Sequence, residues 1–129
     1  DNQIVINLLS FGFKYGSPID ADFVFDVRIL PNPHWNPTLR AATGLDAEVG
    51  KFFADYPEVA EMTGDIATFL NRWLPDFLHN NRHTVTVAIG CTGGKHRSVF
   101  ITKHLQDRLQ DSLPEGLTVT GTHREKHRW

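Results

Sequence analysis

The sequence predicts a single α/β domain in which a mainly parallel or mixed sheet of about four strands is flanked by helices. Its 129 residues fit one domain. Short segments rich in apolar and β-branched residues alternate with longer segments in which apolar residues recur at helical spacing. Over residues 84–122 a predicted strand, helix and strand follow one another, which implies a right-handed parallel crossover. We find no internal repeat, low-complexity segment or linker, so residues 1–129 form one domain with a basic tail at 122–129.

Residues 3–11 open the domain with a predicted buried strand, because the segment is almost entirely apolar or β-branched. Gly12, Gly16 and Pro18 then mark a loop. Residues 23–29 predict a second strand, in which alternation separates two faces. The first face would hold Phe23, Phe25, Val27 and Ile29, and the second Val24, Asp26 and Arg28. Three prolines in residues 30–37 end this strand.

Two helices are predicted next. Residues 46–55 suit a short helix with Asp46 as its N-cap. Over residues 58–78 the apolar positions follow one helical stripe, formed by Val59, Met62, Ile66, Phe69, Leu70, Trp73 and Phe77. Pro75 should kink this second helix or end it early, because proline lacks the amide donor that a helix interior needs.

The last third of the chain predicts a strand, a turn, a helix and a strand. Residues 84–89 alternate as a strand, and residues 90–94 form the turn. Residues 97–111 are helical, with Ile101, Leu105 and Leu109 spaced by four. Pro114 and Gly116 end that helix, and residues 117–122 form the last strand.

Composition excludes several classes of protein. The apolar share is 40% and the charged share 22%, as in globular domains. No apolar run approaches the length of a membrane span, and no signal-peptide pattern opens the chain, so we expect no membrane partner. A lone cysteine favours a reducing, cytoplasmic setting. The net charge of −2 argues against wholesale nucleic-acid binding but allows a local basic patch such as residues 123–129.

The segment 89–98, IGCTGGKHRS, predicts an anion-binding loop between a strand and a helix. A glycine-rich turn there exposes backbone N–H groups, and the helix dipole adds positive potential. Gly93 and Gly94 allow close approach of a ligand to the backbone. Further donors could come from Thr92, Lys95, His96, Arg97 and Ser98. Such loops lie at the carboxyl ends of strands, where open α/β sheets bind ligands, so we expect a phosphorylated ligand. The alternative is a turn that merely starts a helix.

This loop does not match a nucleotide-binding Walker A motif, since GxxxxGK[ST] is absent. Cys91 and Arg97 do stand in a C-x5-R frame, similar to the phosphate loop of cysteine-dependent phosphatases. A thiolate favoured by the helix N-terminus would be the nucleophile, and Asp76 is a distant candidate for the general acid. Gly90 stands where those phosphatases usually carry histidine. The ordinary alternative is a small buried cysteine at the start of a helix.

A second polar group follows the second strand. Arg28, Asn32 and His34 would meet the Cys91 loop at one sheet edge and bind the part of a ligand that is not phosphate, with His34 able to carry a proton. The alternative for Asp26 and Arg28 is an ion pair or an exposed face. His123 and His127 have metal-ligand spacing if helical, but without nearby cysteines we expect a solvated basic tail, no metal and no cofactor.

Several motifs occur in a specific order along nearly the whole chain. They are Phe11–Gly16, Pro18–Asp22, Phe25–Arg28, Leu30–Pro33, Thr43–Asp46 and Ala88–Ser98. Together they make the chain resemble the C-terminal domain of the RapZ family, the RNase adaptor proteins of bacteria. Full-length members of that family also carry an N-terminal P-loop nucleotide-binding domain, which these 129 residues do not include, so nucleotide hydrolysis is not expected of this chain.

The resemblance implies a fold like the sugar-phosphate-binding subdomain of phosphofructokinase and a regulatory, non-enzymatic role. It implies binding of glucosamine-6-phosphate, homo-oligomerisation, and presentation of small regulatory RNA to an endoribonuclease. The phosphate would contact Thr92, Gly93, Gly94, His96 and Arg97, and the sugar would lie near His34. The basic tail of the family is matched in character by Arg124, Lys126 and Arg128, which would contact RNA. A cysteine-dependent phosphatase and a pure oligomerisation module remain the alternatives.

Overall fold

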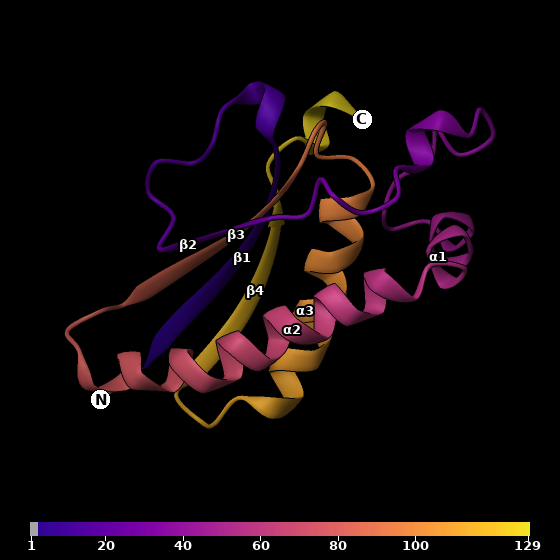
Figure 1. The fold of residues 1–129 in the computed structure, drawn as a ribbon. Helices are drawn as coiled ribbons and strands as arrows, with labels where there is room; N and C mark the ends of the chain where they lie inside the picture. Colours follow the sequence, from indigo (N-terminus) through magenta and orange to yellow (C-terminus); the bar gives the residue numbers. More distant parts are fainter. Residues whose placement is uncertain (1–2) are drawn as a thin grey trace.

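The computed structural model describes residues 3–129 and has one sheet of four strands. The strands are β1 (Ile4–Gly12), β2 (Phe23–Asp26), β3 (Thr84–Cys91) and β4 (Leu117–His123). They lie in the order β2-β3-β1-β4, and every neighbouring pair is parallel. The predicted four-stranded α/β fold is confirmed (Figure 1).

Three helices connect the strands: α1 (Ala47–Ala54), α2 (Pro57–Trp73) and α3 (Arg97–Ser112). The fully buried Ile6 and Leu8 of β1 and Val87 of β3 belong to one core with Leu70 of α2 and Leu105 of α3. On the other face of the sheet, Thr84, Thr118 and Thr120 are exposed. The helices therefore cover one face of the sheet and leave a threonine-rich face open. No helix formed by the described residues is long and apolar enough to cross a membrane.

The second strand is shorter than the sequence predicted. It ends at Asp26, and the side chain of Ile29 is 85% exposed instead of sharing a buried face with Phe23 and Phe25. The reason is local, because the Asp26 carboxylate accepts the backbone N–H of Arg28 at 2.9 Å and turns the chain away from the sheet. A further turn from Val27 to Leu30 then leads toward the functional site.

The boundaries of the helices follow the sequence signals closely. The α1 helix begins one residue after Asp46, although the Asp46 carboxylate accepts from the N–H of Thr43 at 2.7 Å and not from the helix. The α2 helix ends at Trp73, and a 3-10 helix over Leu74–His79 follows, so Pro75 ends the regular helix as predicted. Phe69 and Trp73 belong to the predicted apolar stripe but are exposed near the end of α2, which differs from the prediction.

The strand β3 runs two residues further than predicted. Gly90 and Cys91 pair with Phe11 and Gly12 of β1, so the turn consists of residues 92–96. Gly90 is required by this pairing, because a Cβ there would lie 2.5 Å from the ring of Phe11. The carboxyl ends of the two central strands therefore meet directly beneath the loop that leads to α3.

Candidate functional site

The loop between β3 and α3 is shaped by glycines in close contact with β1. A Cβ on Gly12 would lie 2.6 Å from the carbonyl carbon of Gly93, so the two backbones approach as closely as only glycine allows. Gly94 has a φ of 72°, the left-handed region that favours glycine. The backbone N–H of Lys14 donates to the carbonyl oxygen of Thr92 at 3.1 Å. These contacts fix the loop against the end of the central strand.

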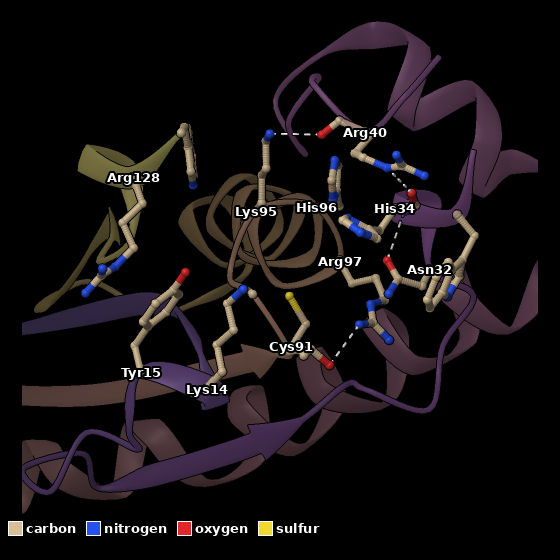
Figure 2. Close-up of a pocket in the computed structure, with 14 residues that line it drawn as sticks. Lys14, Tyr15, Asn32, His34, Arg40, Cys91, Lys95, His96, Arg97 and Arg128 are labelled. Carbon is tan, nitrogen blue, oxygen red and sulfur yellow. Dashed lines mark hydrogen bonds between the residues drawn. The ribbon is translucent and has the colours of Figure 1, made fainter. Parts of the chain in front are cut away.

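A cavity of about 440 Å³ opens above this loop (Figure 2). Its lining residues come from four segments: Lys14, Tyr15, Asn32, His34, Trp35, Arg40, Cys91, Thr92, Gly93, Lys95, His96, Arg97, Arg128 and Trp129. Five of them carry permanent positive charge, and none of the described lining residues is a carboxylate. In a domain of net charge −2, this concentration of cations favours an anionic ligand.

Arg97 lies at the base of the cavity and is only 4% exposed. Its Nη1 donates to the carbonyl oxygens of Arg28 at 2.6 Å and of Leu30 at 3.1 Å, and its Nη2 lies 3.4 Å from Thr92 Oγ1. Its Nε is buried and has no partner among the described residues. Burial lowers the pKa of this guanidinium, while the neighbouring Cys91 opposes the shift. Arg97 therefore ties the segment after β2 to the loop while it faces the cavity.

Lys95 and His96 line the cavity but are already engaged with the backbone of the neighbouring segment. Lys95 Nζ donates to the carbonyl oxygen of Arg40 at 2.9 Å, and His96 Nε2 lies 3.0 Å from the carbonyl oxygen of Leu39. Burial lowers the pKa of His96, which favours the neutral ring. In this arrangement Nε2 of the neutral ring donates to Leu39, so the remaining ring nitrogen, Nδ1, can only accept a hydrogen bond.

Asn32 and His34 lie at the same sheet edge as the Cys91 loop, as the sequence predicted. The Asn32 side chain accepts the N–H of His34 at 3.1 Å and starts a short 3-10 helix, Pro33–Trp35. Arg40 Nε donates to the carbonyl oxygen of His34 at 3.0 Å and fixes this wall. Trp35 stands at the rim with 77% of its side chain exposed.

Three predicted ligand contacts do not line the cavity. The Arg28 side chain pairs with Asp26 at 2.7 Å and lies 3.9 Å from the centre of the Phe13 ring, so only its carbonyl oxygen serves the site. This pairing lowers the pKa of the Asp26 carboxyl. Ser98 is buried and accepts a hydrogen bond from the Cys91 thiol at 3.1 Å. Gly94 faces Glu125 and Gly12 instead of the cavity.

The sequence analysis missed the opposite wall, formed by Lys14, Tyr15, Arg128 and Trp129. Lys14 could have been anticipated, because it follows the central strand at its carboxyl end, where parallel sheets place ligands. Arg40 and Trp129 carry no comparable local signal. The guanidinium of Arg128 lies 3.7 Å from the centre of the Tyr15 ring, so the end of the described chain packs on the loop after β1.

Residues 124–129 are docked against β1 through Arg124 and Glu125, while Lys126, His127 and Arg128 are exposed, so the predicted solvated tail is solvated only in part. Arg124 and Arg128 both pair with the buried carboxylate of Glu125, at 2.8 Å and 3.1 Å, because the acid sits against the end of β1. RNA contact by Arg124, Lys126 and Arg128 stays a prediction.

The histidine pair with metal-ligand spacing is His123 and His127. His123 Nδ1 lies 2.6 Å from Ser10 Oγ, and residues 3–129 contain no group of three or more potential metal ligands.

Of the residues proposed for phosphatase chemistry, Cys91 and Arg97 line the same cavity, whereas the candidate acid Asp76 lies elsewhere. Cys91 lines the cavity but is 3% exposed, and it ends β3 instead of starting the helix. Asp76 lies in the 3-10 helix after α2, pairs with Arg72 at 3.4 Å, and lines a separate apolar hollow with Phe23 and Trp73. A nucleophile and an acid therefore do not face one ligand in this arrangement.

Comparison with known proteins confirms the family that the sequence motifs indicated. The family model described as the RapZ C-terminal domain matches residues 4–127. The chain is similar to a nucleotide-binding protein of Psychrobacter arcticus, with 95% identity over all 129 residues, which span 40% of that relative. A nucleotide-binding protein of Pseudomonas fluorescens is 60% identical over 81% of the chain and 36% of the relative. One from Acinetobacter baumannii is 51% identical over the whole chain and 44% of the relative. The chain thus spans less than half of each of these relatives.

Proposed function

The chain belongs to the RapZ C-terminal domain family, and we propose that it is a regulatory, non-enzymatic domain that binds a small phosphorylated sugar at the loop of residues 92–97. The ligand class we propose is an amino-sugar phosphate such as glucosamine-6-phosphate. The observation that carries the proposal is the cavity itself, where five cations converge and no described lining residue is acidic.

Each part of such a ligand has a matching part of the cavity. A phosphate would lie over the loop, where Thr92, Gly93 and Arg97 meet at the start of the 16-residue helix α3 and the helix dipole adds positive potential. The sugar hydroxyls would face Asn32 and His34 on one wall. Trp35 at the rim offers a flat apolar surface for a ring. A compact anion with a polar ring is therefore better suited than a simple oxyanion.

A binding role is better supported than phosphate hydrolysis. Hydrolysis by a cysteine nucleophile needs an accessible thiolate and an acid for the leaving group. Cys91 is buried and donates to Ser98, and Asp76 lies in a different hollow. The relatives named nucleotide-binding proteins are more than twice as long as this chain, and we propose that their nucleotide is held outside the part that it matches.

The proposal is tested by calorimetric titration with glucosamine-6-phosphate, with glucosamine and inorganic phosphate as controls, followed by an assay for released phosphate. We expect the phosphosugar to bind more tightly than either control, without release of phosphate. If none of the three binds, the loop is structural or holds a different anion. Released phosphate would instead favour the cysteine-dependent phosphatase.

A further inference from the structure

A buried carboxylate stands behind one wall of the cavity without lining it. Glu125 is 1% exposed and is not among the lining residues. Its Oε2 accepts from the backbone N–H of Gly12 at 3.0 Å and from Arg124 Nε at 2.9 Å. Its Oε1 accepts from Arg128 Nε at 3.1 Å. A buried acid with this many donors is held in one place, because leaving any of these charged partners unpaired is costly.

Through Glu125, the segment of residues 124–129, here called the C-terminal wall, is fastened to both the central strand and the ligand loop. The N–H of Arg124 donates to the carbonyl oxygen of Ser10 at 2.9 Å. A Cβ on Gly94 would lie 2.6 Å from Glu125 Cγ, so the loop glycine leaves the space that the acid fills. Trp129 Nε1 donates to the carbonyl oxygen of Gly94 at 3.3 Å.

The C-terminal wall in turn presents two residues to the cavity. Arg128 and Trp129 both line it, and Figure 2 shows Arg128 on the same side as Tyr15 and Lys14, across from Arg40 and His34. Arg128 is pinned between the Glu125 carboxylate and the Tyr15 ring. The position of this side of the cavity therefore depends on a carboxylate that lies outside it.

We propose that Glu125 is a positioning residue for the anion site, and that it holds the C-terminal wall closed against the loop so that a bound anion and the docked wall stabilise each other. This proposal rests on the function proposed above. It adds that residues 124–129 are part of the ligand site and that their docking responds to the ligand.

The direction in which Glu125→Gln changes anion affinity distinguishes a positioning role from simple charge neutralisation. Replacing Glu125 with glutamine removes a negative charge beside a cationic cavity. If Glu125 only neutralised nearby arginines, the loss would strengthen the binding of an anion by Coulomb attraction. If Glu125 positions the wall, the same loss weakens binding because Arg128 and Trp129 are released. The two roles therefore predict opposite changes in affinity.

The test compares Glu125→Gln with Glu115→Gln by titration with glucosamine-6-phosphate. Glu115 is exposed in the connection between α3 and β4, and its replacement changes the net charge by the same amount. We expect Glu125→Gln to weaken binding about ten-fold, as for the loss of a charged hydrogen bond. Glu115→Gln should stay within about two-fold of the wild type. Equal or tighter binding by Glu125→Gln overturns the positioning role while the proposed function stands.

A measurement on the wild type keeps the proposal testable even if the variant does not fold. Cleavage by trypsin after Arg124 requires the C-terminal wall to leave its place, because Arg124 is half-buried and bonded to Glu125 and Ser10. We expect saturating glucosamine-6-phosphate to slow this cleavage, followed by mass spectrometry. Inorganic phosphate, which lacks the sugar, should protect less. Unchanged cleavage with the site occupied would refute the coupling, whereas a wild type that binds no phosphosugar would overturn the proposed function and this proposal with it.

Discussion

The guanidinium of Arg97 donates a 2.6 Å hydrogen bond to the carbonyl oxygen of Arg28, 69 residues earlier in the chain. A second bond from the same nitrogen reaches Leu30. The residue that the loop motif assigned to phosphate thus also holds the segment that carries Asn32 and His34. Ligand binding and local stability are joined in one buried side chain.

Replacing Arg97 with alanine should therefore weaken both properties. Two backbone carbonyls lose their donor, which should lower the free energy of unfolding by about 1–3 kcal/mol. Affinity for a phosphosugar should fall about ten-fold or more, since a charge-assisted hydrogen bond is lost. Urea unfolding and calorimetric titration measure the two effects separately. Unchanged affinity in a folded variant would remove Arg97 from the ligand site.

Lys14 provides a test of the wall that the sequence analysis missed. Lys14→Gln should weaken phosphosugar binding several-fold, because it removes one of five cations that line the cavity. Lys51→Gln makes the same change of charge on an exposed position of α1 and serves as the control. Both variants should unfold at nearly the wild-type urea concentration. Equal affinities for the two variants would mean that Lys14 does not face the ligand.

Gly94 should be much less tolerant of alanine than Gly16, although both have positive φ, 72° and 92°. Gly16 has φ 92° and ψ 142°, outside the left-handed helical region, and a Cβ there meets nothing within 4 Å, so Gly16→Ala costs only backbone strain, about 1–3 kcal/mol. A Cβ on Gly94 would lie 2.6 Å from Glu125 Cγ and from the nitrogen of Gly12. Gly94→Ala should lower the unfolding free energy further and disturb the site. Similar losses in the two variants would contradict the close packing of Glu125.

The Cys91→Ser variant distinguishes a binding domain from a cysteine-dependent phosphatase. Cys91→Ser should leave phosphosugar affinity within about two-fold, because the buried thiol makes its hydrogen bond to Ser98 and not to a ligand. The wild type should release no phosphate from a phosphosugar or an aryl phosphate. Turnover that disappears in Cys91→Ser while binding persists would establish the phosphatase instead.

Stability should fall as the pH drops through the ordinary pKa of histidine. Burial lowers the pKa of His96 from 6.5, and carbonyls of Leu39 and Ala42 oppose this only in part. Below 6.5 the unfolded chain therefore binds a proton that the folded ring rejects, which favours unfolding by at most about 1.4 kcal/mol per pH unit. The stability that the neutral His96 ring contributes is present above pH 6.5 and is lost as the pH falls below it. Urea unfolding between about pH 7.5 and pH 5 measures the slope.

A His96→Gln variant should show a smaller slope and not a flat one. Burial also lowers the pKa of His123, with Lys126 and Lys103 adding to the shift, so this ring contributes with the same sign. An unchanged slope in His96→Gln would contradict the assignment of a buried neutral ring at that position.

The sequence by itself determined the regular structure and the chemistry of the loop. Apolar and β-branched composition predicted β1, alternation predicted β3, and periodicity near 3.6 predicted α2 and α3, because these patterns depend on which side of each element is buried. Pro75 ended α2 for a covalent reason that no tertiary contact can change. The glycines of the segment 89–98 predicted a turn between a strand and a helix, which the structure has at residues 92–96, and anion binding by this turn stays a prediction. The early end of β2 was missed, since the Asp26 carboxylate competes there with sheet pairing.

Only the tertiary structure decided which residues share the cavity and which of them already form hydrogen bonds to neighbouring backbone carbonyls. Lys14, Arg40 and Arg128 converge because they follow β1, β2 and β4, and the parallel strands of the sheet bring these carboxyl ends to one edge. Lys14 follows the end of a strand, but nothing near Arg40 or Arg128 in the sequence indicates that meeting. Glu125 interrupts a basic run in the sequence, and in the structure it anchors that run by accepting a hydrogen bond from Gly12. The sequence could not show this role, because Gly12 lies 113 residues away. Periodicity reports the burial of a neighbourhood in the chain, whereas a site is assembled from distant segments by packing.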